Sequence, residues 1–247
     1  MTATHGGYHP AECCSGKSDS ATSTNGLAAA QAHFYIADGE VDPFGSISSH
    51  RFDRYWFLTE SSIDAVGNEI IFENEYVHLQ PKAITDANKN RVESVSDAIG
   101  RNVGVAMVGK PGKDKGDSLE GFNVVLSPEQ LAKFIQDPAG DSARQLLGNA
   151  GHRVISNDYY TQEGEVFIPP FRAQLARDTH YRSTTASQIS VSITYLNGNG
   201  EAIQTVSLSD DIKGVRKWAV SSAIQDSKGE VARQFLPVYI SIRGLPA

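Results

Sequence analysis

Four side chains near the N-terminus are of the types that bind zinc. His5, His9, Cys13 and Cys14 together offer two nitrogen and two sulfur donors, the set that a tetrahedral zinc site uses. Their spacing argues against such a site, because adjacent cysteines do not readily face one ion and zinc motifs separate their cysteines by at least two residues. We keep these four residues as candidate ligands for adventitious zinc or copper and expect a solvated segment there.

A second pattern resembles a calcium-binding loop. Asp86, Asn88, Asn90 and Asp97 occupy the first, third, fifth and twelfth positions of such a loop. Arg91 stands at the sixth position, where that loop needs glycine for its sharp bend. A plain turn rich in Asp and Asn therefore explains the segment better than a calcium site.

A third pattern imitates the spacing of a phosphate-binding P-loop. Gly104, Gly109 and Lys110 fit that spacing, but Pro111 occupies the place of the Ser or Thr that would bind magnesium. Proline followed by glycine is also a poor opening for the helix that such a loop feeds. We reject nucleotide binding here and expect no cofactor.

The groups suited to acid–base catalysis form no local signature. There is no Gly-x-Ser-x-Gly elbow, no His-Glu-x-x-His pattern and no cysteine beyond position 14 to act as a nucleophile. Catalytic triads and carboxylate pairs assemble from distant positions, so this lowers the enzyme interpretation without removing it. We commit to no catalytic residue and lean against an enzyme. The histidines available for such chemistry are His33, His50, His78, His152 and His180.

An aromatic cluster lies between residues 52 and 58. We predict that Tyr55 to Leu58 form a strand, whose alternation places Tyr55 and Phe57 on one face and Trp56 on the other. Such rings can stack on a sugar, but we expect them to enter the core.

Composition excludes several classes of partner. The chain has 22 Lys and Arg against 29 Asp and Glu, a formal net charge of −7, which disfavours nucleic acid and anionic lipid. No apolar run approaches the roughly 20 residues of a membrane-spanning helix. The N-terminus shows no basic segment followed by an apolar one, so we expect cytoplasmic synthesis and leave the final location open. The two cysteines are adjacent, so disulfides do not hold the fold.

We divide the chain into a flexible polar arm, residues 1–27, and a single β-rich domain, residues 28–247. The arm is rich in Ser, Thr, Gly, Ala and His, and has too little apolar surface to offset the entropy of ordering it. We find no repeat of fixed period and no linker that would divide the rest.

The clearest structural signal is an antiparallel hairpin over residues 188–210. Apolar and polar residues alternate on both sides of an Asn-Gly-Asn-Gly turn, which predicts one dry face and one wet face. A turn centred on Gly198-Asn199 pairs Val191 with Val206, whereas one centred on Asn199-Gly200 pairs Ile193 with Val206. Both registers keep the apolar side chains together.

Helix signals are few. Ser127, Pro128 and Gln130 predict a capped helix start, and Asp137-Pro138 ends that helix. A second short helix fits 142–147, with Asp141 as its cap. For part of residues 212–223 we favour a helix. We predict a final strand over residues 236–242, and Pro237 places that strand near the edge of a sheet.

These patterns predict a mainly β protein, an antiparallel two-sheet sandwich or jelly-roll-like domain with one or two short helices and a flexible N-terminal arm. The function that we favour is a noncatalytic structural or interaction protein that self-associates or binds another protein, for example a viral or phage-type shell or assembly subunit. Two alternatives remain open. One is a carbohydrate-directed enzyme that uses carboxylates assembled by the fold, and the other is a soluble glycan- or membrane-binding toxin-like protein.

Overall fold

A computed structural model describes residues 31–113, 115–163, 166–183, 187–210, 216–226 and 228–241. By its internal contacts the chain divides into two compact units, residues 1–91 and 92–247. The predicted class is confirmed, since antiparallel strands dominate and two short helices accompany them. The predicted arm, residues 1–27, lies outside the described residues, and the single domain from residue 28 onward stays a prediction.

The first unit is an antiparallel meander in which each strand pairs with the next one along the chain. β-bulges interrupt the pairing between β2 and β3 and between β4 and β5. Residues 31–32 are helical, and no helix lies between β1 and β5 in the described part of this unit. The strands are β1 (Gly39–Val41), β2 (Ile47–Phe52), β3 (Thr59–Ile63), β4 (Glu69–Glu75) and β5 (Gln80–Thr85).

The segment predicted as an aromatic strand, Tyr55 to Leu58, is a tight loop between β2 and β3. The strand prediction was wrong because Asp53 organises the chain locally. Its backbone N–H donates to the carbonyl of Leu58, 2.9 Å away, and its own carbonyl accepts from the N–H of Trp56, at 3.0 Å. Trp56 adopts a left-handed conformation with φ of 60°, which no β-strand contains.

One turn geometry, closed by a backbone bond from the N–H of its first residue to the carbonyl four residues later, recurs at six places in the described part of the chain. Each turn begins with Asp or Asn, whose side chain accepts the backbone N–H four residues later, and its fourth residue has positive φ. This is the three-residue hairpin loop with a left-handed residue, which favours glycine. The turns begin at Asp42, Asp64, Asp86, Asp97, Asn197 and Asp226. Asp42, Asp64, Asp86 and Asp97 lie 22, 22 and 11 residues apart, and Asp53, whose loop is one residue longer, lies 11 residues from both Asp42 and Asp64. The turns in this part of the chain therefore begin at multiples of 11 residues, and the prediction of no repeat of fixed period was wrong here.

The second unit contains one large antiparallel sheet and a separate two-stranded hairpin, β9–β10. The strand order in the large sheet is β6-β7-β8-β11-β12-β13-β14, and both β15 and β16 pair with β14. The strands are β6 (Arg91–Ser96), β7 (Asn102–Gly109), β8 (His152–Asn157), β9 (Thr161–Glu163), β10 (Val166–Ile168), β11 (Phe171–Arg177), β12 (Ile189–Leu196), β13 (Ala202–Asp210), β14 (Arg216–Gln225), β15 (Val231–Gln234) and β16 (Val238–Ser241).

The predicted hairpin is confirmed as β12 and β13, in the second of the two registers. Ile193 pairs with Val206, and both side chains are buried. The turn is wider than a two-residue turn, because Asn197 and Glu201 close it by a backbone bond of 2.9 Å from the N–H of Asn197. A register shift at Tyr195 and Leu196 accommodates the additional residue.

Part of residues 212–223 was predicted to be helix, and this was wrong for the described part from Arg216 onward, which is β14. Trp218 lies opposite Leu208, and Val220 lies opposite Val206, so the buried face of β13 continues across β14. This long-range pairing decides the conformation over the ambiguous local pattern. The predicted final strand is confirmed as β16, which pairs with β14 after Pro237.

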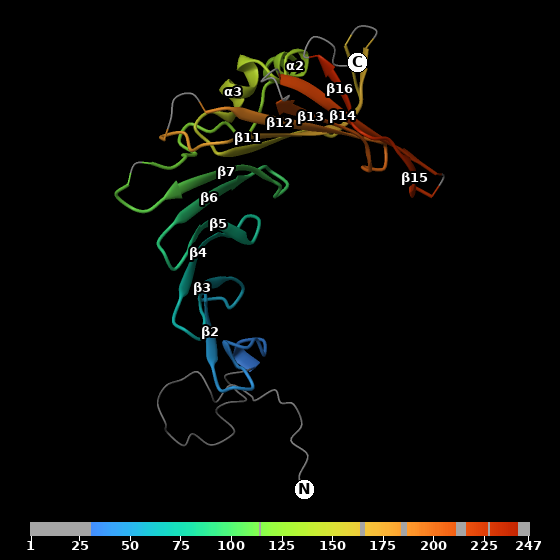
Figure 1. The fold of residues 1–247 in the computed structure, drawn as a ribbon. Helices are drawn as coiled ribbons and strands as arrows, with labels where there is room; N and C mark the ends of the chain where they lie inside the picture. Colours follow the sequence, from blue (N-terminus) through green and yellow to red (C-terminus); the bar gives the residue numbers. More distant parts are fainter. Residues whose placement is uncertain are drawn as a thin grey trace, which may run out of the picture. The chain divides into compact units, whose positions relative to one another are not determined.

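Two helices cover one face of the second unit's sheet, α2 (Pro128–Gln136) and α3 (Asp141–Leu147) (Figure 1). The predicted capping box of α2 is present, since Ser127 accepts from the N–H of Gln130 and the side chain of Gln130 accepts from the N–H of Ser127. For α3 the predicted cap was one residue off. Gly140 is the N-cap, without a side-chain hydrogen bond, and Asp141 is the first helical residue.

The core of the second unit lies between these helices and the strands. Phe134 and Leu147 from the helices pack with Leu175, Val206 and Trp218 from the sheet, and all five side chains are buried. The layer facing this sheet is therefore helical, which differs from the two stacked sheets expected of a sandwich. The hairpin's dry face is real, but a pair of amphipathic helices covers it.

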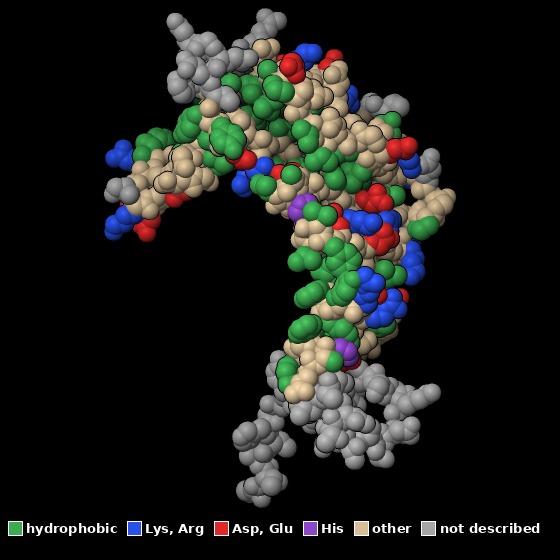
Figure 2. Space-filling view, turned by 180° about the vertical axis from the view of Figure 1, so that it is seen from behind, with side chains coloured by type: hydrophobic (Ala, Val, Ile, Leu, Met, Phe, Trp, Pro, Cys, Tyr) green, Lys and Arg blue, Asp and Glu red, His purple; other side chains and the backbone are tan. Residues whose placement is uncertain are grey.

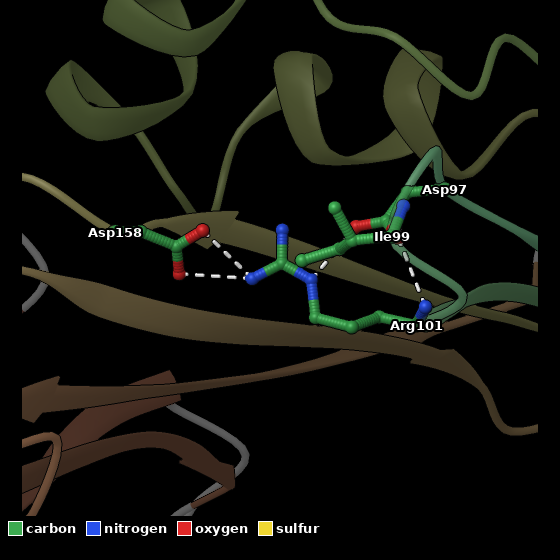
Figure 3. A network of polar contacts seen from close by, with 4 residues as sticks. All are labelled: Asp97, Ile99, Arg101 and Asp158. Carbon is green, nitrogen blue, oxygen red and sulfur yellow. Dashed lines mark hydrogen bonds and ion pairs between the residues drawn. The ribbon is translucent and has the colours of Figure 1, made fainter.

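A charged network fastens the β6–β7 turn to the end of β8 (Figure 3). The Nε of Arg101 donates to Asp97 Oδ2 at 2.7 Å, and its Nη1 donates to both carboxylate oxygens of Asp158, at 2.9 and 2.7 Å. Hydrogen bonds from the guanidinium to these carboxylates raise the pKa of Arg101 above its ordinary value, against the opposing effect of burial. The network joins two segments distant in sequence within the second unit.

Candidate interaction surface

The candidate metal ligands His5, His9, Cys13 and Cys14 lie outside the described residues, so that hypothesis stays a prediction. Among the residues that the structure describes, no group of three or more His, Cys, Asp or Glu side chains is arranged to hold a metal ion. In the same part of the chain, no helix is both long and apolar enough to cross a membrane.

The calcium-like segment is a turn. Asp86 Oδ1 accepts the backbone N–H of Asn90 at 2.7 Å, and Asp86 Oδ2 accepts the side-chain amide of Asn90 at 2.8 Å. Lys89 has a φ of 66° at the position where the other five recurring turns have a glycine with positive φ. The preference for an Asx-rich turn is therefore confirmed.

The P-loop-like glycine Gly104 lies inside strand β7, so it belongs to no phosphate-binding loop. A Cβ at this position would lie 2.6 Å from Cζ of Phe122. The glycine is needed because the Phe122 ring packs directly on the strand backbone.

The structure places one histidine beside a deeply buried carboxylate. His180 Nδ1 lies 3.1 Å from Oδ2 of Asp117, which is only 2% exposed, and Asp117 Oδ1 accepts the backbone N–H of Tyr181 at 2.8 Å. This pair escapes prediction from the sequence, since 63 residues separate its members. Such a contact orients an imidazole ring, as it does in catalytic triads. Among the described residues no hydroxyl or thiol side chain is hydrogen-bonded to His180. The pair connects the loop of Asp117 to the loop of His180 and Tyr181.

The other histidines are dispersed over several elements. His33 stacks on Trp56 with ring centroids 3.6 Å apart, and His78 Nδ1 lies 2.8 Å from Glu75 Oε1. His50 lies in β2, and His152 lies in β8. Burial lowers the pKa of His152, which makes it neutral over a wider pH range than an exposed histidine.

Asp53 holds the aromatic loop of the first unit in place. Its Oδ1 accepts the backbone N–H of Phe57 at 2.8 Å, and its Oδ2 accepts the hydroxyl of Tyr76 at 2.7 Å. Burial raises the pKa of this carboxyl, but the hydrogen bonds outweigh it and the net pKa is lowered. The expectation that these rings form a core was wrong for Phe57 and Tyr55, since both remain exposed.

The sheet of the first unit exposes apolar side chains on both faces. Ile70 and Ile71 are neighbours in β4 and so point to opposite faces, yet they are 39% and 36% exposed. Ile63 in β3 and Ile84 in β5 are also exposed, and Ala83 is the one buried hydrophobic residue described in this unit. Figure 2 shows hydrophobic side chains gathered at its surface. We use the name bare sheet for the exposed apolar side chains on the two faces of β2 to β5.

The second unit also exposes strand edges. All four residues of β15 are exposed, and Val238 and Tyr239 of β16 are exposed beside β14. An edge strand presents unpaired backbone donors and acceptors that favour pairing with another chain. The bare sheet and these edges are the surfaces that suit contacts with protein.

Comparison with known proteins adds a similarity of fold. No family model matches the chain, and no curated protein matches it. The crystal structure of TcdB2-TccC3-TEV matches 84% of this chain with a TM-score of 0.63 and 16% identity, and that of TcdB2-TccC3-Cdc42 matches 84% with a TM-score of 0.59 and 14% identity.

A third similar structure, the Photorhabdus luminescens Tc holotoxin pore with the mutation TccC3-D651A, matches 78% of this chain with a TM-score of 0.58 and 17% identity. The chain spans only 12% to 13% of the length of these three proteins. At this level of identity, the likeness is one of fold: this chain is similar to a part of components of Tc toxin complexes.

Proposed function

We propose that this chain is a noncatalytic structural part of a multi-protein toxin complex, in which its sheet is covered by protein neighbours. The bare sheet carries this proposal. A β-sheet becomes stable by packing an apolar face against a second layer, and the first unit provides no such layer among its described residues. The similarity to parts of much longer Tc toxin components supports a role within a larger assembly.

The chemistry of the surface favours protein as the covering partner. Exposed isoleucines gain free energy when another apolar surface removes them from water, at roughly 25 cal/mol per Å². The net charge of −7 opposes the alternative of a phosphate-rich partner. The partner is either a different subunit or a second copy of this chain. Of these two, binding to a second copy can be measured with the purified protein alone.

An enzyme acting on carbohydrate is less well supported. Glycoside hydrolysis needs two carboxyl groups about 5 to 9.5 Å apart, flanking one bond. A cavity of about 310 Å³ in the second unit is lined by a single carboxylate, that of Glu120. The polar pairs described above connect neighbouring loops and turns.

Sedimentation velocity over a concentration series tests the proposal. We expect the intact chain to associate, and Ile71→Lys in the bare sheet to weaken that association at least tenfold, because it places a charge in the contact. Val66→Lys is the matched control, since Val66 is exposed in the β3–β4 turn, outside the strands, and the change leaves association unaffected.

A strictly monomeric chain whose first unit is nevertheless stably folded would contradict the proposal. Liposome leakage or glycan binding by that monomer would favour the toxin-like binding alternative instead. Association that survives Ile71→Lys unchanged would show that the bare sheet is not the contact.

A further inference from the structure

A cavity of about 310 Å³ lies in the second unit, between α2, α3 and the segment around Phe122. Its walls combine the apolar side chains of Phe122 and Leu126 with the amides of Gln130 and Gln145. Cavities that bind small molecules are concave, largely apolar and supplied with a few polar groups that fix the ligand's orientation, and this volume is at the lower end of their range.

Arg153, which lines this cavity from β8, is only 3% exposed. Its Nη1 donates to the carbonyl of Leu146 and its Nη2 to the carbonyl of Asn123, both at 2.6 Å. A guanidinium has five N–H donors, and these two bonds occupy only part of that capacity. The Nε atom is buried without a hydrogen-bond partner in the described part of the chain.

No carboxylate among the described residues forms an ion pair with Arg153. The carbonyl groups that it contacts are neutral, so no carboxylate of the described residues compensates its buried positive charge. Burial lowers the pKa of Arg153 to about 10, which leaves it protonated at neutral pH. An uncompensated buried cation beside a cavity creates a favourable position for an anion.

The ring of Phe122 fixes the orientation of this guanidinium. The guanidinium carbon of Arg153 lies 4.4 Å from the centroid of that ring. Gly104 pairs with Arg153 across β7 and β8, and its missing side chain leaves the room that the ring occupies. The stacking fixes the plane of the guanidinium. A guanidinium held in one plane presents its N–H donors in the geometry that the two oxygens of a carboxylate accept.

We propose that the cavity binds a small monocarboxylate, whose oxygens accept hydrogen bonds from Arg153 and whose carbon chain contacts Phe122 and Leu126. The one acidic side chain of the lining, Glu120, repels a second negative charge, which favours one carboxylate over two. The site is independent of the bare sheet, because every residue that forms it lies in the second unit.

Isothermal titration of the intact chain with propionate and with its neutral isostere propionamide, at constant ionic strength, tests the proposal. We expect saturable propionate binding in the millimolar range and at least about tenfold weaker binding of propionamide, because the amide lacks the charge-assisted bonds. Equal binding of the two, no saturable heat, or an equal response to chloride would overturn the proposal.

Two variants locate the site. Arg153→Met abolishes the preference for propionate over propionamide if the guanidinium binds the carboxylate, and a preserved preference would overturn the proposal. Should that variant fail to fold, Glu120→Gln decides, since Glu120 is exposed and tolerates change. It is expected to strengthen propionate binding about twofold by removing the like charge, whereas weaker binding would contradict the assignment.

Discussion

The two units of this chain are built from the same kind of strand, yet among the described residues only the second has a large buried core. In the second unit, the strands β11 and β12 alternate buried residues with more exposed ones, and the helices α2 and α3 pack against the buried set. In the first unit, Ile70 and Ile71 lie on opposite faces of β4 and both remain exposed. A regular meander of hydrogen-bonded strands is therefore not sufficient to form a core.

The difference lies in what the sequence supplies beyond the strands. The second unit contains a helical segment whose apolar side, which includes Phe134 and Leu147, faces the sheet. The first unit inserts turns and the loop held by Asp53, neither of which provides a layer. The proposed function predicts that part of the stability of the first unit comes from other protein surfaces, whereas the second unit packs helices against its own sheet.

The largest expected effect is a difference in stability loss between two phenylalanine variants, one in each unit. Phe134→Ala, in the helix layer, is expected to destabilise the second unit by about 3 to 5 kcal/mol, because it empties a fully buried site. Phe57→Ala in the first unit removes a ring that is 66% exposed, and is expected to change stability by less than about 1 kcal/mol. Chemical unfolding monitored by circular dichroism measures both. Similar losses would show that the first unit has a core of its own.

Gly104→Ala tests the packing of the second unit at a single strand position. The new methyl group would lie 2.6 Å from the Phe122 ring, so we expect a loss of about 1 to 3 kcal/mol as the ring is displaced. The control is Gly198→Ala, where nothing lies within 4 Å of the added carbon. Thermal unfolding of the two variants compares them, and equal midpoints would contradict the close packing of Phe122.

Acidification is expected to weaken the second unit through His152. Burial lowers its pKa in the folded state, so below the unfolded value of about 6.5 the unfolded chain binds the proton more readily. The stability contribution is present above that pH and is lost as the pH falls through the folded pKa. His152→Gln removes this dependence in urea titrations between pH 7.5 and 5, and His50→Gln in β2 serves as control. An unchanged pH profile in the His152 variant would contradict the assignment.

The smallest expected effect concerns the recurring turn. Lys89→Gly relieves a left-handed backbone at φ 66° and is expected to stabilise the first unit by up to about 1 kcal/mol. Gly67→Ala at the same turn position, with φ of 87°, is expected to destabilise it by about 1 kcal/mol. Unfolding midpoints of the associated protein measure both, and effects of the same sign would contradict the shared geometry.

Local patterns predicted the features that local physics determines. The alternation of residues 188–210 predicted the hairpin, and Ser127 with Gln130 predicted the helix cap, because both depend on neighbours in sequence. The conformation of β14 and the Asp117–His180 pair depend on partners far along the chain, which one sequence does not reveal. The lack of a covering layer over Ile70 and Ile71 among the described residues was equally hidden, since exposed and buried isoleucines look alike in a sequence.

Amide hydrogen exchange of the intact chain, measured at low and at high protein concentration, tests the central claim most directly. We expect the amides of β2 to β5 to exchange much faster than those of β11 to β14 in dilute protein, and to become protected as the protein associates. Equal protection of the two units in dilute, monomeric protein would contradict the claim that the bare sheet depends on a covering partner.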